Sequence, residues 1–130
     1  MEESYDCTIE NLGKGGAIPL INDKCAADIA QNAIVKVLGE EALCPQMPTM
    51  GSESYSQYMI AAPGCYGNLG IRNDEVGSGA EIHNPLFDID ERAMVTGAAA
   101  HVAFALEYLN GDYPLEHSSE YANLGEFLKG

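Results

Sequence analysis

The chain has 130 residues, and its 46% hydrophobic content is that of an ordinary globular domain rather than of a disordered segment. Its 20 acidic and 6 basic residues give a formal net charge of -14 at pH 7. A field of this sign repels phosphate backbones and anionic lipid surfaces, so we expect neither nucleic acid nor membrane as a partner.

The first predicted elements are a short strand and a helix. Loose alternation over residues 3–9 predicts the strand, and the glycines that follow predict a loop. Apolar residues at helical spacing predict a helix over residues 22–38, with Asn22 as its N-cap, Asp23 complementing its dipole and Gly39 ending it. Its apolar face is Ala26, Ile29, Ala30, Ala33, Ile34, Val37 and Leu38.

The middle of the chain predicts weaker elements. Residues 44–50 contain two prolines and indicate a loop or an edge strand. A second helix is predicted over residues 52–62, ended by Pro63 and Gly64. Residues 65–71 then predict a strand, although Gly67 and Asn68 interrupt it, and residues 72–80 predict a surface loop.

A third helix is predicted from Asp88 or Ile89 to residue 110, because Asp88 and Glu91 have the spacing of a capping box. Gly111 is placed to end it, and a short amphipathic piece at residues 121–128 follows in the polar tail. The predicted packing face of the third helix is Met94, Gly97, Ala98, His101, Ala105 and Leu109.

The alternation of helices and strands predicts an α/β fold in which helices pack on a small mixed sheet. Only two or three strands are visible, which is too few for a self-sufficient sheet of this type. The sequence therefore predicts an incomplete half of such a domain.

The cysteines and the first residues bear on location. Cys7, Cys25, Cys44 and Cys65 form no C-x-x-C pair, so neither a zinc knuckle nor a disulfide framework is indicated. The start, MEESYD, is acidic and polar, unlike a secretory signal. We therefore expect reduced thiols and a cytoplasmic protein.

Among the histidines, His83 stands in the run EIHNPLFDIDE, on a turn stiffened by Pro85. From the residues alone, an exposed loop histidine is more often no ligand, and a catalytic zinc needs about three protein ligands. His101 reads as a packing residue of the third helix and His117 as solvated. Neither a phosphate-binding loop nor a Gly-x-Ser-x-Gly elbow is present.

Three runs taken together, MGSES, APGCYGNLGI and IHNPLFDIDE, resemble the C-terminal part of the catalytic domain of the M20 metallopeptidase and amidohydrolase family, in particular its N-acyl amino acid amidohydrolases. The resemblance covers residues 18 to 110 and implies a zinc-exopeptidase-like domain. Departures include Ser54, where the family has aspartate, and Leu86, where a basic residue is common. It divides the chain into a lid-like connector at 1–17, the catalytic segment at 18–111 and a tail at 112–130.

What the resemblance implies for the site is a divalent metal centre, zinc, manganese or similar, with His83 as one ligand and Glu53 near the substrate. The general base and the other ligands would lie upstream, in sequence that this chain lacks. The implied reaction is hydrolysis of the amide bond of N-acyl amino acids or small peptides. We expect the chain to be the C-terminal segment of such an enzyme, inactive alone and completed by a missing N-terminal half.

Two other functions stay open at this point. The chain could be the complementing subunit of a split enzyme, with an exposed sheet edge as its interface. It could also be a non-catalytic α/β binding module that kept the fold without the chemistry.

Overall fold

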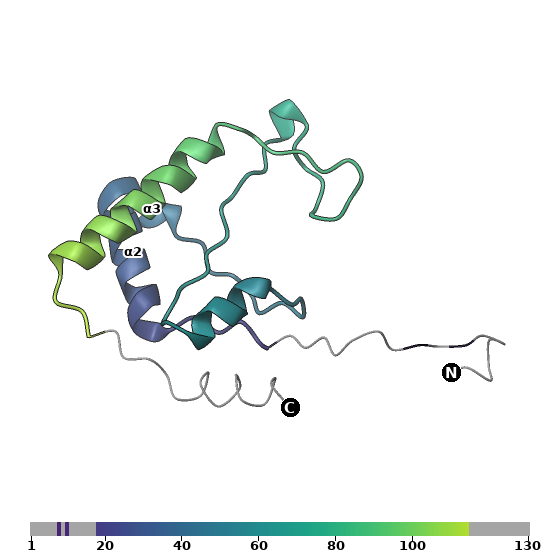
Figure 1. Ribbon diagram of the computed structural model, residues 1–130. Coiled ribbons are helices and arrows are strands. Elements are labelled where there is room, and N and C mark those ends of the chain that lie inside the picture. The colour runs from purple at the N-terminus through teal and green to yellow at the C-terminus, as the bar shows by residue number, and fades with distance from the viewer. Residues whose placement is uncertain (1–7, 9, 11–17, 115–130) are drawn as a thin grey trace.

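The structure is a computed structural model that describes residues 8, 10 and 18–114. Two α-helices, α2 (Lys24–Leu38) and α3 (Ala93–Asn110), pack against each other. Three short 3-10 helices accompany them: η1 (Glu40–Ala42), η2 (Ser54–Ile60) and η3 (Asp74–Val76). Figure 1 shows the helix pair on one side of the molecule and a long looped excursion on the other, joined by an extended segment.

The predicted α/β fold is wrong for the described residues, which are mostly helical and contain no β-strand. Residues 65–71 run without any regular element, and the nearest thing to a ladder is an isolated bridge between Asn73 and Ser78. A strand exists only where a neighbouring backbone completes its hydrogen bonds, and the bond from the Asp90 amide to the Ile71 carbonyl at 3.1 Å does not continue into a ladder along this segment. Its interruption by Gly67, Asn68 and Gly70 weakens it further. The predicted strand at residues 3–9 falls almost wholly outside the described residues, as does the tail helix at 121–128.

The helix α2 closely follows its prediction except at the cap. The side chain of Asp23, not Asn22, accepts a hydrogen bond from the Ala26 amide at 2.8 Å, which makes Asp23 the N-cap. Gly39 ends the helix with φ +91°, a conformation that costs glycine little. The predicted apolar face is largely confirmed, with Ala26, Ile29 and Ala33 buried.

The helix α3 begins later than predicted, and the Asp88–Glu91 capping box does not form. Asp90 donates its backbone N–H to the Ile71 carbonyl and is held in the loop, so the helix starts at Ala93 without a side-chain cap. The predicted packing face was also wrong: apart from Gly97 its members are exposed. The side that turns inward is Ala93, Gly97, Ala99, Ala100, Ala103, Phe104 and Glu107.

The second predicted helix forms as η2, shorter than expected. Its Met59 packs with Ile18 in a small buried cluster, covered by Leu20, Tyr55 and Ile60. Asn22 ties this region to α2, because its side chain accepts from the Tyr66 amide at 2.8 Å and donates to the Tyr66 carbonyl at 2.9 Å. None of the described helices is long and apolar enough to cross a bilayer.

Candidate functional site

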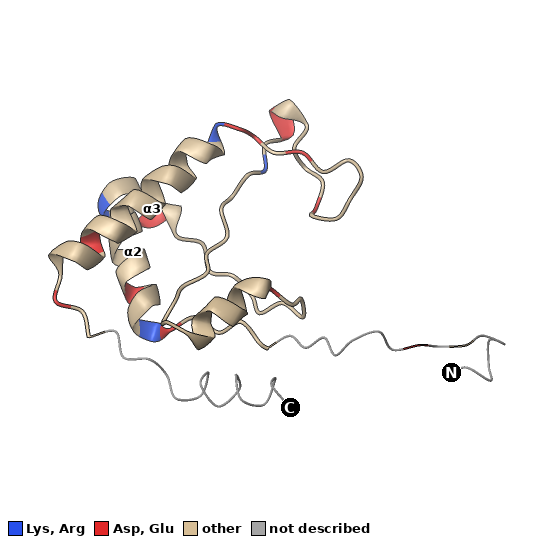
Figure 2. Ribbon diagram, viewed as in Figure 1, with Lys and Arg blue, Asp and Glu red and all other residues tan. Residues whose placement is uncertain are grey.

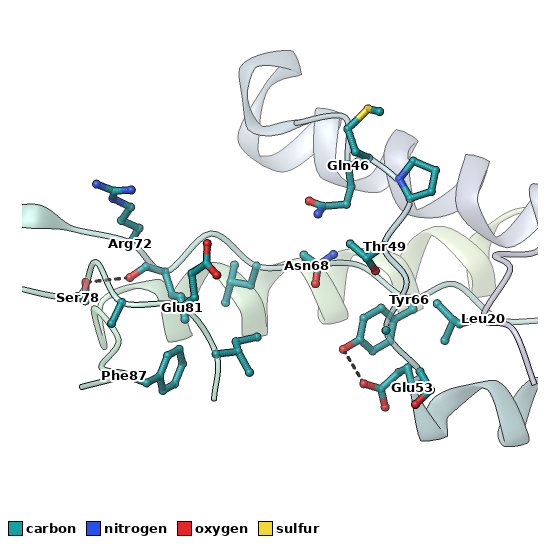
Figure 3. A pocket seen from close by; sticks show the side chains of 18 of the residues that line it. Leu20, Gln46, Thr49, Glu53, Tyr66, Asn68, Arg72, Ser78, Glu81 and Phe87 are labelled. Carbon is teal, nitrogen blue, oxygen red and sulfur yellow. Dashed lines mark hydrogen bonds between the residues drawn. The ribbon is translucent and has the colours of Figure 1, made fainter. Parts of the chain in front are cut away.

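An open cleft of about 970 Å³ lies between four stretches of chain. One wall is formed from residues 46–53, the floor from residues 66–72, and the far wall from residues 78–82 with Phe87 and Asp88; Pro19, Leu20 and Asn22 complete the lining. Figure 3 shows Gln46 and Thr49 above the floor, Tyr66, Asn68 and Arg72 along it, and Glu81 and Phe87 at the far end. A volume of this order suits a small organic ligand.

Glu53 lines the cleft and also holds it in shape. One carboxylate oxygen accepts from the Tyr55 amide at 3.3 Å as the N-cap of η2, and the other accepts from the Tyr66 hydroxyl at 3.3 Å (Figure 3). Partial burial and the adjacent Glu53 carboxylate raise the pKa of Tyr66, so its hydroxyl stays a donor at neutral pH. The structure therefore places Glu53 at the cleft, already engaged with two partners.

His83 lies on an exposed double turn next to the far wall. The Asn84 amide donates to the Glu81 carbonyl at 3.2 Å, and the Phe87 amide donates to the Asn84 carbonyl at 2.9 Å. Within the first of these turns His83 adopts φ +68°, the only positive φ of a non-glycine residue among the described residues. This left-handed conformation is uncommon for a residue with a Cβ, and functional sites are where such strain collects.

A polar clamp fixes the base of the His83 loop. The Asn73 side chain donates to Asp90 at 2.7 Å, while the Asp90 amide donates to the Ile71 carbonyl at 3.1 Å. The buried Ser78 hydroxyl accepts from the Asn73 amide at 2.8 Å and donates to the Ile71 carbonyl at 3.1 Å. Hydrogen bonds from Arg92 and then Asn73 hold the pKa of Asp90 well below its usual range. These hydrogen bonds therefore hold the two ends of the loop that carries His83 together.

The described residues do not by themselves fit a metal centre. They contain no group of three or more His, Cys, Asp or Glu side chains arranged to hold an ion. His83 is one imidazole donor, and it is not among the residues that line the cleft beside Glu81 and Ile82. Burial raises the pKa of the Cys65 thiol. A metal bound by His83 would need its other ligands from residues outside the described part of the chain.

The sequence predicted two site residues, and the structure places Glu53 in the lining of the cleft and His83 on the adjoining loop, outside the lining. The sequence did not predict the clamp, because Asp90 falls within the first turn of the helix predicted from Asp88 or Ile89. The Asn73–Asp90 contact joins residues 17 apart, and no local pattern announces it. The turn at Asn73 could have been predicted, because asparagine side chains often bond the backbone two residues further on, as Asn73 does with the Glu75 amide at 3.0 Å.

Comparison with known proteins identifies a family and several relatives. Residues 5–107 match the model of Peptidase family M20/M25/M40. The chain is 36% identical to "IAA-amino acid hydrolase ILR1-like 6" of Arabidopsis thaliana over 79% of this chain and 23% of that protein. It is 34% identical to "IAA-amino acid hydrolase ILR1-like 4" of the same plant, over 70% of this chain and 21% of the relative. It is 29% identical to "Thermostable carboxypeptidase 2" of Saccharolobus solfataricus, over 85% of this chain and 24% of the relative.

No solved structure matches the chain. The chain spans about a quarter or less of the length of these curated relatives. The family match covers most of the chain, including η2, the cleft, the His83 loop and nearly all of α3. The chain belongs to the metal-dependent peptidase family M20/M25/M40 and corresponds to part of such an enzyme.

Proposed function

We propose that this chain is the C-terminal segment of a metal-dependent amidohydrolase that cleaves the amide bond of N-acyl amino acids or small peptides. The observation that carries the proposal is the family match over residues 5–107 together with His83, held in a left-handed turn beside the cleft. The names of the relatives describe hydrolases of IAA–amino acid conjugates and carboxypeptidases, which share cleavage next to an amino acid.

His83 is the metal ligand of this segment, and the metal is a divalent ion such as zinc or manganese. When bound, such a metal activates water for attack on an amide carbonyl. The residues of this chain do the positioning. The clamp at Asp90 and Asn73 fixes the loop that presents the His83 imidazole, and Glu53 orients the Tyr66 hydroxyl over the cleft floor.

The substrate is held in the cleft. Its floor combines the apolar side chain of Leu69 with the amide of Asn68 and the Tyr66 hydroxyl, which suits a ligand with an apolar acyl group and a polar amide. Glu53 lies at one end of this floor and contributes to substrate binding through Tyr66.

The isolated chain is inactive, because one imidazole does not make a catalytic metal site. It therefore acts with the remaining part of an M20 enzyme. The alternative of a subunit joined through a sheet edge has lost its support, since the described residues form no strand. The cytoplasmic location stays a prediction.

The test uses a chimera in which this chain replaces the matched segment of the Arabidopsis ILR1-like 6 hydrolase. We expect the chimera to hydrolyse an IAA–amino acid conjugate and the 130-residue chain alone to show no turnover. The exposed substitution Glu40→Gln on η1 serves as a control that leaves the activity of the chimera unchanged. Hydrolysis by the pure chain, abolished by His83→Ala, would contradict the claim that it is inactive alone. A folded but inactive chimera would contradict the assignment as a catalytic segment.

A further inference from the structure

The helix α3 has an uncovered apolar side, which is named here the outer face of α3. Its members are Met94, Val95, Val102, Leu106 and Leu109, and their side chains are between 55% and 75% exposed. They recur at helical spacing on the side opposite the one that packs on α2. Between them lie Ala98 and Ala105, which are also exposed.

This face carries no charge to keep it in water. Figure 2 shows α3 almost free of acidic and basic residues along its length. Its one carboxylate, Glu107, points to the inner side, where it accepts from the Lys36 ammonium at 2.6 Å and from the Tyr113 hydroxyl at 2.6 Å. A wide apolar helix face is normally covered by a neighbouring element, yet α3 contains no buried residue.

We infer that the outer face of α3 docks on an apolar surface of the remaining part of an M20 hydrolase. The inference rests on the proposed function. What covers this face is inferred from chain length, because the matched relatives are four to five times longer than the segment they share with this chain. In such a protein the rest of the domain lies at hand to cover the face, whereas the isolated chain has nothing described to place there.

The chemistry of the occupant follows from the face itself. It offers apolar side chains with alanines between them and no salt-bridge partner except the imidazole of His101. The complementary surface is therefore uncharged and aliphatic, and it approaches the helix closely at Ala98 and Ala105. The charge of -14 resides elsewhere on the chain and takes no part in this contact.

The experiment measures how fast a thiol on the face is alkylated. Val102→Cys, at a position 59% exposed, is compared with Val76→Cys on η3, at a position 53% exposed. Both are small substitutions at exposed positions, so neither disturbs the fold. Each is made in the 130-residue chain and in the chimera with the ILR1-like 6 hydrolase, and labelling is read by mass spectrometry of the modified peptide.

In the chain alone, both thiols should react at the rate of an exposed cysteine. In the folded, monomeric chimera, Val102→Cys should react at least tenfold more slowly and Val76→Cys at an unchanged rate. Equal reactivity of Val102→Cys in both proteins would overturn the inference. Protection already present in the chain alone, with a doubled mass in solution, would overturn it in favour of a second copy.

The two proposals fail in different ways. A chimera that protects Val102→Cys but does not hydrolyse a conjugate retains the docking surface and loses the proposed function. An active chimera in which Val102→Cys is not protected retains the proposed function and loses the docking surface. A chimera without any folded fraction counts against docking, because the outer face would then not fit the surface left open in a relative.

Discussion

The two long helices of this chain differ in how much of their environment the chain supplies. The helix α2 buries Ala26, Ile29 and Ala33, has a side-chain cap at Asp23 and ends at a left-handed glycine. The helix α3 is longer and more apolar, yet it has no side-chain cap and no buried residue. Local sequence supplies α2 with its cap, its end and its buried face. By contrast, α3 has the apolar composition of a helix that is normally covered by neighbouring elements.

The largest expected effect is a difference between the two helices in how much the free energy of unfolding falls when a large apolar side chain is truncated. Ile29 is fully buried in α2, so Ile29→Ala should lower the free energy of unfolding by about 2 to 4 kcal/mol through lost burial and a cavity. Leu106→Ala removes a similar side chain from the outer face of α3 and should change it by less than about 0.5 kcal/mol. Urea unfolding followed by circular dichroism measures both. Equal losses would show that α3 is as well packed as α2.

The next largest effect is expected at the N-cap of α2. Asp23→Ala should remove the hydrogen bond to the Ala26 amide and cost about 1 kcal/mol of helix stability. Asn22→Ala should leave the helicity of α2 intact and instead free the Tyr66 backbone, because among the described residues its side chain bonds to Tyr66 and not to the first turn of α2. Residue-level hydrogen exchange distinguishes the two sites. Faster exchange in the first turn of α2 for Asn22→Ala would make Asn22 the cap after all.

The contact between the helices should depend on pH. The Lys36 ammonium and then the Tyr113 hydroxyl hold the pKa of Glu107 below its usual value. Its folded pKa is lower than its unfolded pKa of about 4.3, so its contribution is complete above that pH and is lost as the pH falls through the folded value. Thermal melts from pH 7 to pH 3 should therefore show a smaller acid-induced loss for Glu107→Gln than for the unchanged chain. An identical loss in both would remove Glu107 from the contact.

The smallest effect is expected at Gly97, where α3 passes the floor of the cleft. A Cβ there would lie 3.0 Å from a methyl group of Leu69, which is 42% exposed and free to shift. Gly97→Ala should gain up to about 1 kcal/mol of helix propensity and lose much of it to that contact. The midpoint of unfolding should therefore move little. A loss above about 2 kcal/mol would mean that Leu69 is held firmly.

The sequence correctly predicted the elements that depend on residues close to one another along the chain. The body of α2 and its glycine stop follow from spacing and from local backbone preferences, and so does the end of α3 at Gly111. The left-handed turn at His83 was anticipated only as a turn stiffened by Pro85. The family itself was evident from three short runs.

The errors share one cause, which is that each depended on contacts distant in sequence. Residues 65–71 have strand composition but form no strand ladder. Asp90 has the spacing of a helix-start acid but binds Asn73 and Ile71 instead, which delays α3 to Ala93. The apolar face predicted for α3 is real in composition, yet in this chain it points to solvent. That result is what a segment taken from a larger domain should give.

The most direct test of the account is the metal content of the chimera with the ILR1-like 6 hydrolase, with and without His83→Asn. Asparagine tolerates the left-handed turn and removes the imidazole, so the substitution isolates ligation from backbone strain. We expect the His83→Asn chimera to stay folded and to lose bound zinc or manganese at least tenfold more readily on dialysis against a chelator. Unchanged metal stoichiometry and retention in the His83→Asn chimera would contradict the assignment of His83 as a ligand.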